Sequence, residues 1–66
     1  MQLTINGQLQ SFDGQMSVQQ LIECLSLQDK RIAIECNGEI IPRSKYPKQI
    51  LDEGDQLEII VAVGGG

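Results

Sequence analysis

Hydrophobic and polar residues alternate at both ends of the chain. Positions 1, 3 and 5 are apolar and separated by polar residues, and positions 57, 59, 61 and 63 form a second apolar series. Alternation of this kind is typical of a β-strand that buries one face. Asn6-Gly7 is a strong hairpin signal, after which residues 8–12 can return as a second strand. The chain is therefore predicted to begin with a hairpin and to end in a long strand over 56–63.

Between these two ends the hydrophobic period changes to that of a helix. Val18 begins a series with the i, i+3, i+4, i+7 spacing of one helical face, and Leu25 closes it. Ser17 is a favourable N-cap, and Gln20, three residues later, can complete a capping box. The pattern predicts an amphipathic helix that starts at Val18 and ends within 27–30.

A second hairpin follows the predicted helix. Residues 32–36 alternate, and Asn37-Gly38 marks a tight turn into residues 39–41. The stretch 43–48 follows Pro42 and contains Pro47, and it is expected to be a surface loop. Two hairpins thus flank one helix, whose single apolar stripe must be buried against one face of a sheet. We predict an α+β roll that forms one domain over residues 1–66.

Composition narrows the classes of function. A chain of 66 residues buries only about 60% of the surface that it exposes when unfolded, so a large enclosed active site is not expected. Nine acidic and five basic residues give a net charge of -4, which repels nucleic acid and anionic lipid and favours partners with basic docking surfaces. No apolar run approaches a membrane span, and the N-terminus lacks the features of a signal peptide. We expect a cytoplasmic protein that binds neither nucleic acid nor membrane.

The two cysteines do not form a metal-binding pattern. Cys24 and Cys36 are twelve positions apart, there is no C-x-x-C pair, and the chain has no histidine. Both are expected to be small, buried or half-buried hydrophobic residues in a reducing compartment. The alternative is a sulfur relay or a disulfide, although the neighbouring Glu23 and Glu35 disfavour the thiolate. We predict no metal site.

The chain ends in three glycines, Gly64, Gly65 and Gly66, directly after the last predicted strand. At the average glycine usage of about 7%, three given positions are all glycine by chance roughly three times in ten thousand. Because glycine lacks a Cβ, such a tail can enter a narrow channel and present a terminal carboxylate to the active site of another protein. The alternative is a frayed end or an expression-vector remnant. The Gly66 carboxylate is the candidate reactive group, and Gly64 and Gly65 give it access.

Three segments carry a family resemblance: CNGEIIPR at 36–43, LDEGD at 51–55 and EIIVAVGGG at 58–66. In this order they resemble the ThiS family, the sulfur-carrier proteins of thiamine thiazole synthesis, and the similarity spans the whole chain. The resemblance implies a β-grasp, ubiquitin-like fold with a mixed sheet of four or five strands packed on one main helix. In that fold the first and last strands lie parallel and adjacent in the middle of the sheet.

The resemblance also implies a mechanism. A ThiF-type, E1-like enzyme would consume ATP to adenylate the Gly66 carboxylate, and a sulfur donor such as a cysteine desulfurase persulfide would displace AMP to leave a thiocarboxylate. A ThiG-type thiazole synthase would then use that sulfur. The carrier would bind no cofactor and would be a cosubstrate rather than an enzyme, in agreement with its lack of histidine.

A tail of this kind needs a docking surface on the folded body. Ordering three glycines in a channel costs roughly 3 to 6 kcal/mol, which contacts elsewhere must offset. Ile60 breaks the apolar-in, polar-out alternation of the last strand, so we predict a docking face around Ile60 and Ala62. The alternative is that a loop or a neighbouring strand covers Ile60.

Two other functions stay open on the sequence alone. The molybdopterin-synthase small subunit uses the same terminal chemistry, although its tail commonly carries a proline before the glycines, and residues 61–63 contain none. A ubiquitin-like interaction module with an inert tail is the second alternative. Intact-mass measurement after incubation with ATP and an adenylating enzyme separates the carrier from the module.

Overall fold

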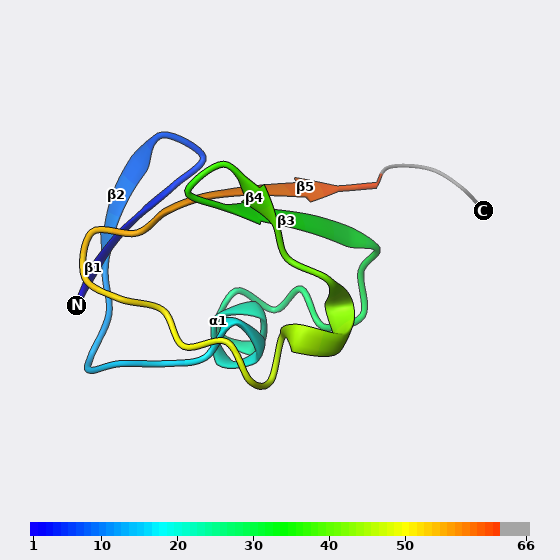
Figure 1. Cartoon of the computed structure of the whole chain (residues 1–66), viewed down its shortest axis with the longest axis horizontal. Helices are drawn as coiled ribbons and strands as arrows, with labels where there is room; N and C mark the ends of the chain where they lie inside the picture. The colour runs from blue at the N-terminus through cyan, green and yellow to red at the C-terminus, as the bar shows by residue number, and fades with distance from the viewer. Residues whose placement is uncertain (63–66) are drawn as a thin grey trace.

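The computed structural model describes residues 1–62, which form five strands, one α-helix and one turn of 3₁₀ helix (Figure 1). The two hairpins and the intervening helix occur in the predicted order. The elements are β1 (Gln2–Ile5), β2 (Gln8–Ser11), α1 (Val18–Cys24), β3 (Ile32–Cys36), β4 (Glu39–Ile40), η1 (Arg43–Lys45) and β5 (Gln56–Val61).

The strands form one mixed sheet in the order β2-β1-β5-β3-β4. The first and last strands, β1 and β5, are parallel neighbours in its middle, with Thr4 opposite Gln56. The other three pairings, β1 with β2, β3 with β4 and β3 with β5, are antiparallel. Figure 1 shows α1 on one side of this sheet. The expected α+β grasp, with one helix on a five-stranded mixed sheet, is confirmed.

Both hairpin turns are built on an Asn-Gly pair. Asn6 and Asn37 each have φ of 52°, and Gly7 and Gly38 have φ of 80° and 87°. Positive φ at both central positions defines a type I′ turn, whose twist matches that of the flanking strands. The two predicted tight turns are therefore confirmed.

The core lies between α1 and the inner face of the sheet. Its buried members come from α1, from the three central strands β1, β3 and β5, and from the long return between β4 and β5. They are Leu3, Ile5, Val18, Leu21, Ile22, Ile34, Cys36, Ile41, Tyr46, Leu51, Leu57 and Ile59. The helix covers only this face, so the opposite face of β1, β5 and β3 is left as molecular surface.

The start of α1 is as predicted, but its end is not. Ser17 accepts a hydrogen bond from the Gln20 backbone, and the Gln20 side chain accepts one from the Ser17 backbone, which completes the capping box. The helix ends at Cys24, at least three residues before the predicted 27–30. Ser26 has φ of 58°, and the Leu27 N–H bonds back to the Ile22 carbonyl. This is a Schellman motif in which serine takes the position usually held by glycine, so the usual stop signal is absent from the sequence.

Candidate functional site

β5 is the strand that leads to the glycines, and Asn6 clamps it on the β1 side. The Asn6 N–H donates to the Leu57 carbonyl at 2.9 Å. Its side-chain Oδ1 accepts from the Ile59 N–H at 2.8 Å, and its Nδ2 donates to the Ile59 carbonyl at 3.1 Å. The backbone of β1 turns away from β5 after Asn6. The Asn6 side chain therefore makes the two hydrogen bonds to Ile59 that a further residue of β1 would otherwise make.

Asn37, in the second Asn-Gly turn, does the same on the β3 side. Its N–H donates to the Gln56 carbonyl at 2.7 Å, and its Oδ1 accepts from the Gln56 N–H at 3.0 Å. Its Nδ2 donates to Asp55 Oδ1 at 3.0 Å. The first part of β5 is therefore hydrogen-bonded on both edges, which gives the strand a rigid attachment to the body.

The end of β5 is held from one side. Ile60 pairs with Ala33 and Val61 with Ile32 of β3, and the Ala62 N–H donates to the Arg31 carbonyl at 2.8 Å. On the β1 side, Ile59 is the last residue of β5 with a hydrogen-bonded partner within residues 1–62. Figure 1 shows this end of β5 extending past β1. The candidate residues Gly64, Gly65 and Gly66 lie outside the described part, so their roles stay predictions.

The predicted docking residues lie where the prediction places them. Ile60 is 60% exposed, and Ala62 is exposed beside it. With Arg31, Ile32 and Ala33 they line a shallow, almost wholly apolar hollow of about 210 Å³. A neighbouring strand lies alongside Ile60 but leaves its side chain open, so the alternative that a loop or strand covers it is wrong. Whether a partner docks there stays a prediction.

Two further exposed apolar residues on this face escaped the sequence reasoning. Leu9 is 65% exposed and Ile40 is 74% exposed. The register puts Leu9 opposite Thr4 and Ile40 opposite Glu35, and paired residues share a face of the sheet. Both therefore lie on the face that α1 does not cover. Only the strand register shows this, because nothing in the local pattern of either hairpin says which face the helix occupies.

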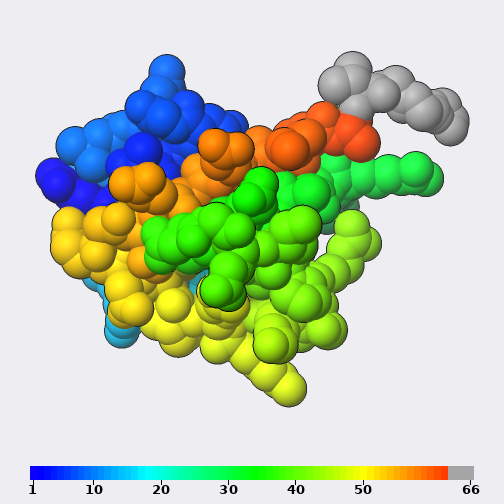
Figure 2. Space-filling model, turned by 45° about the horizontal axis from the view of Figure 1, so that its top comes forward, coloured from blue at the N-terminus to red at the C-terminus, as the bar shows by residue number. Residues whose placement is uncertain are grey.

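The same face carries two carboxylates in the middle of the sheet. Glu35 of β3 lies directly opposite Glu58 of β5. Both line a groove of about 280 Å³ that also includes Gly7 and Gly38 of the two Asn-Gly turns. In Figure 2, β5 runs between the N-terminal hairpin and the β3–β4 hairpin, which form the two sides of this surface. The uncovered face thus combines an acidic groove with an apolar hollow.

The two cysteines differ in environment. Cys36 is buried, and burial raises the pKa of its thiol, to which the negative charge of Asp55 adds. Its Sγ accepts a hydrogen bond from Asn37 Nδ2 at 3.7 Å. The expectation of a buried thiol is confirmed for Cys36 but wrong for Cys24, which is exposed at the last position of α1. Cys24 lies outside the apolar stripe of the helix, whose buried residues are Val18, Leu21 and Ile22, so its side chain faces solvent.

The acidic turn before β5 has a structural role. Asp55 Oδ2 accepts a hydrogen bond from the Asp52 N–H at 2.8 Å, and its other oxygen binds Asn37. Within residues 1–62, no three Asp, Glu, Cys or His side chains come together as a metal site. In that same part of the chain, no helix has the length and apolar character needed to span a bilayer.

Comparison with known proteins identifies the family. The model of the ThiS family matches residues 3–66, which include the three terminal glycines. The chain belongs to the ThiS family. Among the alternatives left open by the sequence, this match supports the thiazole-branch carrier. It also assigns the chain the role of a small sulfur carrier rather than a catalyst.

Relatives of known name and structure agree with the family match. The sulfur carrier protein ThiS of Escherichia coli is 29% identical over the full length of both chains. The crystal structure of the thiamine biosynthesis protein ThiS from Geobacter metallireducens superimposes with a TM-score of 0.84 at 32% identity, again over the full length of both chains. This likeness supports the β-grasp assignment.

A third relative is much longer. The thiazole synthase of Paramagnetospirillum magneticum is 39% identical over the whole of this chain, which spans only 20% of that protein. That thiazole synthase therefore contains a ThiS-like segment within its own polypeptide.

Proposed function

We propose that this ThiS-family sulfur carrier works through the carboxylate of Gly66, which is adenylated, converted to a thiocarboxylate and consumed in thiamine thiazole synthesis. The match to the ThiS family over residues 3–66 carries the proposal, because it includes the glycines as well as the folded body. The rigid attachment of β5 supports it, since Asn6 and Asn37 hold the strand that leads to the tail.

The chemistry follows from the properties of a terminal carboxyl group. With a pKa of about 3.5 the group is ionised at neutral pH and is a poor electrophile. Transfer of AMP from ATP turns one of its oxygens into a leaving group and releases pyrophosphate. Attack by a persulfide then expels AMP and forms an acyl disulfide, and a thiol that cleaves the S–S bond leaves the thiocarboxylate. The carrier supplies only the acyl group, so its own side chains need perform no acid or base catalysis.

Three partners follow from this sequence of steps. A ThiF-type, E1-like enzyme adenylates Gly66, a cysteine desulfurase persulfide donates the sulfur, and a ThiG-type thiazole synthase accepts it. The Paramagnetospirillum magneticum relative supports the last partner, because it joins a ThiS-like segment to a thiazole synthase. The use of ATP and of free thiols places the protein in the cytoplasm in this proposal, with no cofactor bound to the carrier.

Gly64 and Gly65 provide access for the carboxylate. Four residues after Ala62 extend at most about 14 Å, so the adenylating site must lie within that distance of the end of β5. A channel lined closely around the chain excludes side chains, which glycine does not have. Ordering the three glycines costs roughly 3 to 6 kcal/mol, and burial of the exposed Ile60 and Ala62 against the partner offsets part of this.

Mass spectrometry of the intact protein tests the carrier function. Incubation with ATP and the adenylating enzyme should add the mass of AMP, and further incubation with the sulfur donor should replace one oxygen by sulfur. An unchanged mass in the presence of an enzyme that adenylates a related carrier would contradict the proposal and favour an inert interaction module.

The docking residues are tested separately from the chemistry. Ile60→Glu places a charge in the apolar hollow, so we expect slower adenylation at limiting carrier concentration but an unchanged circular dichroism spectrum. Glu53→Gln, an exposed change in the turn before β5, is the control and should behave as the wild type. Equal adenylation rates for the two variants would remove Ile60 from the docking surface.

A further inference from the structure

The central pair of carboxylates on the uncovered face carries an inference beyond the site of sulfur attachment. Glu35 and Glu58 are directly opposed on antiparallel strands, where Cβ atoms lie about 5 Å apart. Like charges in this position destabilise a sheet. Glu35 is also half-buried, which reduces screening of its charge by water.

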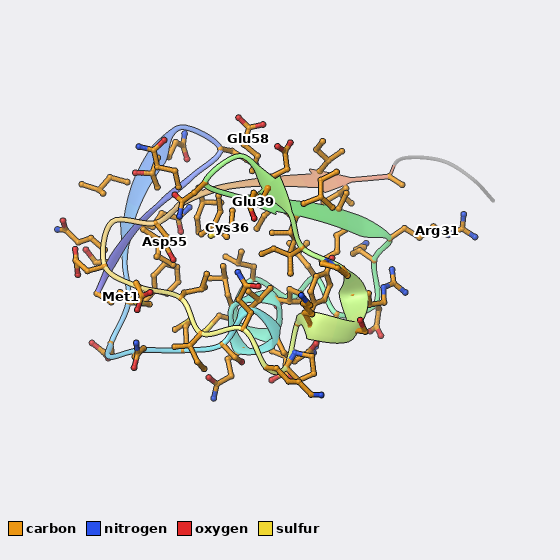
Figure 3. The ribbon with its side chains drawn as sticks, in the orientation of Figure 1. Met1, Arg31, Cys36, Glu39, Asp55 and Glu58 are labelled. Carbon is orange, nitrogen blue, oxygen red and sulfur yellow. The ribbon has the colours of Figure 1, made fainter. Side chains whose placement is uncertain are left out.

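Neither carboxylate has a stabilising partner in the described part of the chain. Within residues 1–62 the carboxylates that accept hydrogen bonds are those of Glu23, Asp52, Glu53 and Asp55. Figure 3 shows Glu58 directed away from the core, toward the uncovered side of the sheet. Within residues 1–62, two like charges thus face each other on adjacent strands without a hydrogen-bonding partner.

The groove around this pair has the dimensions of a binding site for one long side chain. Its volume is about 280 Å³, and its walls include Gly7 and Gly38, the tips of the two Asn-Gly turns. Because glycine has no side chain, neither of these two residues obstructs the groove. A guanidinium group is planar, always charged and suited to two carboxylate acceptors, so it satisfies this pair better than an ammonium group does.

The acidic groove and the apolar hollow form one continuous surface. Ile60 and its partner Ala33 are the next outward-facing residues along β5 and β3 after Glu58 and Glu35. Two residues of a strand span about 7 Å, which is within the footprint of a single docking element. Ile40, paired with Glu35, adds an exposed apolar side chain on the other flank.

We infer that an arginine of the thiazole synthase enters the groove between Glu35 and Glu58 while an apolar side chain of the same enzyme fills the hollow at Ile60. The inference rests on the proposed function, in which that synthase accepts the sulfur. Charge complementarity supports it, because a carrier with a net charge of -4 associates with a basic surface. The occurrence of a ThiS-like segment within a thiazole synthase supports this choice of partner.

The positions of the groove and the hollow define how the carrier is oriented on the synthase. Groove and hollow lie one after the other along β5, and the strand continues from them toward the glycines. When the arginine binds in the groove and the apolar side chain binds in the hollow, the orientation of β5 is fixed. The tail is then directed toward the active site of the synthase before its glycines enter. Docking of the arginine relieves the repulsion between the two carboxylates. The pair therefore contributes to recognition of the synthase and not to the stability of the free carrier.

The test compares binding and stability in the same variants. Glu35→Gln, Glu58→Gln and the double variant are titrated into purified thiazole synthase of the same organism, and the Kd is measured by calorimetry at low and high salt. Glu39→Gln is the matched control, since Glu39 directly precedes Ile40 in β4 and its side chain projects from the opposite side of that strand. We expect the double variant to bind at least about tenfold more weakly at low salt. Its Tm should rise by about 1 to 5 °C, and the control should bind as the wild type does.

Chemical modification of the synthase identifies the basic group. Phenylglyoxal, which blocks arginine, should reduce the difference in Kd between wild type and double variant to less than about twofold, whereas acetylation of the lysines, which removes their charge, should leave it unchanged. An equal Kd for wild type and double variant on untreated synthase overturns the inference. A difference that survives phenylglyoxal overturns the assignment to arginine.

Failure of this inference can be distinguished from failure of the proposed function. Formation of the thiocarboxylate is followed by intact mass without the synthase present, so it reports on Gly66 and not on the groove. Normal sulfur loading together with equal binding of all variants contradicts the inference alone. Absence of sulfur loading in the wild type contradicts the proposed function, whatever the binding results.

Discussion

The two faces of the sheet are formed by the same strands but differ in the burial of their apolar side chains and in the pairing of their charges. On the inner face, Leu3, Ile34 and Leu57 are fully or almost fully buried under α1. On the uncovered face, Ile60 and Ile40 are exposed, and two glutamates are opposed without a partner in residues 1–62. The inner face is optimised for folding. The outer face retains features that cost stability or solubility in isolation, as is expected of a surface that acts on a partner.

The largest expected effect comes from a matched pair of truncations on β5. Leu57→Ala removes a buried side chain from the inner face and should lower the free energy of unfolding by roughly 2 to 5 kcal/mol. Ile60→Ala shortens an exposed side chain three residues later and should change it by less than about 0.5 kcal/mol. Urea denaturation of both variants measures the contrast. Similar losses would mean that the outer face also contributes to the core.

A smaller effect is expected from the clamp on β5. Asn6→Gly keeps the positive φ of the turn but removes the side chain that pairs with Ile59. The backbone N–H and carbonyl groups of Ile59 are partly buried and lose their hydrogen-bonding partner in this variant. The loss should lower the free energy of unfolding by about 1 to 2 kcal/mol. Hydrogen exchange at the Ile59 amide should accelerate more than exchange at the Val18 amide, which donates to the Gln49 carbonyl away from β5. Equal acceleration at both amides would indicate general destabilisation and not a local clamp.

The buried cysteine predicts a pH dependence. Because burial raises the folded-state pKa of Cys36 above its ordinary value of 9.0, the fold favours the neutral thiol. The associated stability is fully present below pH 9 and is lost as the pH rises through the folded-state pKa. Cys36→Ala should therefore show a shallower decline of stability above pH 9 than the wild type. Parallel decline in the two proteins would exclude the thiol as a cause.

The smallest effect on the fold is expected from removal of Gly66. The deletion withdraws the carboxylate by about 3.5 Å and leaves the described contacts of residues 1–62 untouched. The free energy of unfolding should be unchanged, whereas adenylation should be lost because the carboxylate no longer reaches the reacting phosphate. The loss is measured by intact mass after incubation with ATP. Full adenylation of the shortened chain would show that the tail length is not critical.

Most of the fold could be predicted because its signals are local. The capping box at Ser17 and Gln20 and the two Asn-Gly turns each act within four residues, and the structure confirms them. The end of α1 could not be predicted, since Ser26 adopts a positive φ that serine rarely takes. The exposure of Cys24 could have been predicted, because Cys24 lies outside the apolar stripe that begins at Val18 and closes at Leu25.

The candidate site was predicted only in part. Ile60 and Ala62 were found because their alternation along one strand is visible in the sequence, and the structure confirms their exposure. Leu9 and Ile40 were missed, because their position on the same face depends on which strands become neighbours. The acidic pair was missed for the same reason, since Glu35 and Glu58 are far apart in the chain.

By itself, the sequence determined the order of elements, the two turns, the start of the helix and the glycine run, because each depends on the conformational preferences of neighbouring residues. Only the tertiary structure decided that Asn6 and Asn37 hold β5 from both sides and that Glu35 faces Glu58. These contacts join segments about 20 to 50 residues apart, and their register is set by packing the sheet on α1. The local sequence specifies the strands, and burial of one face decides what they present on the other.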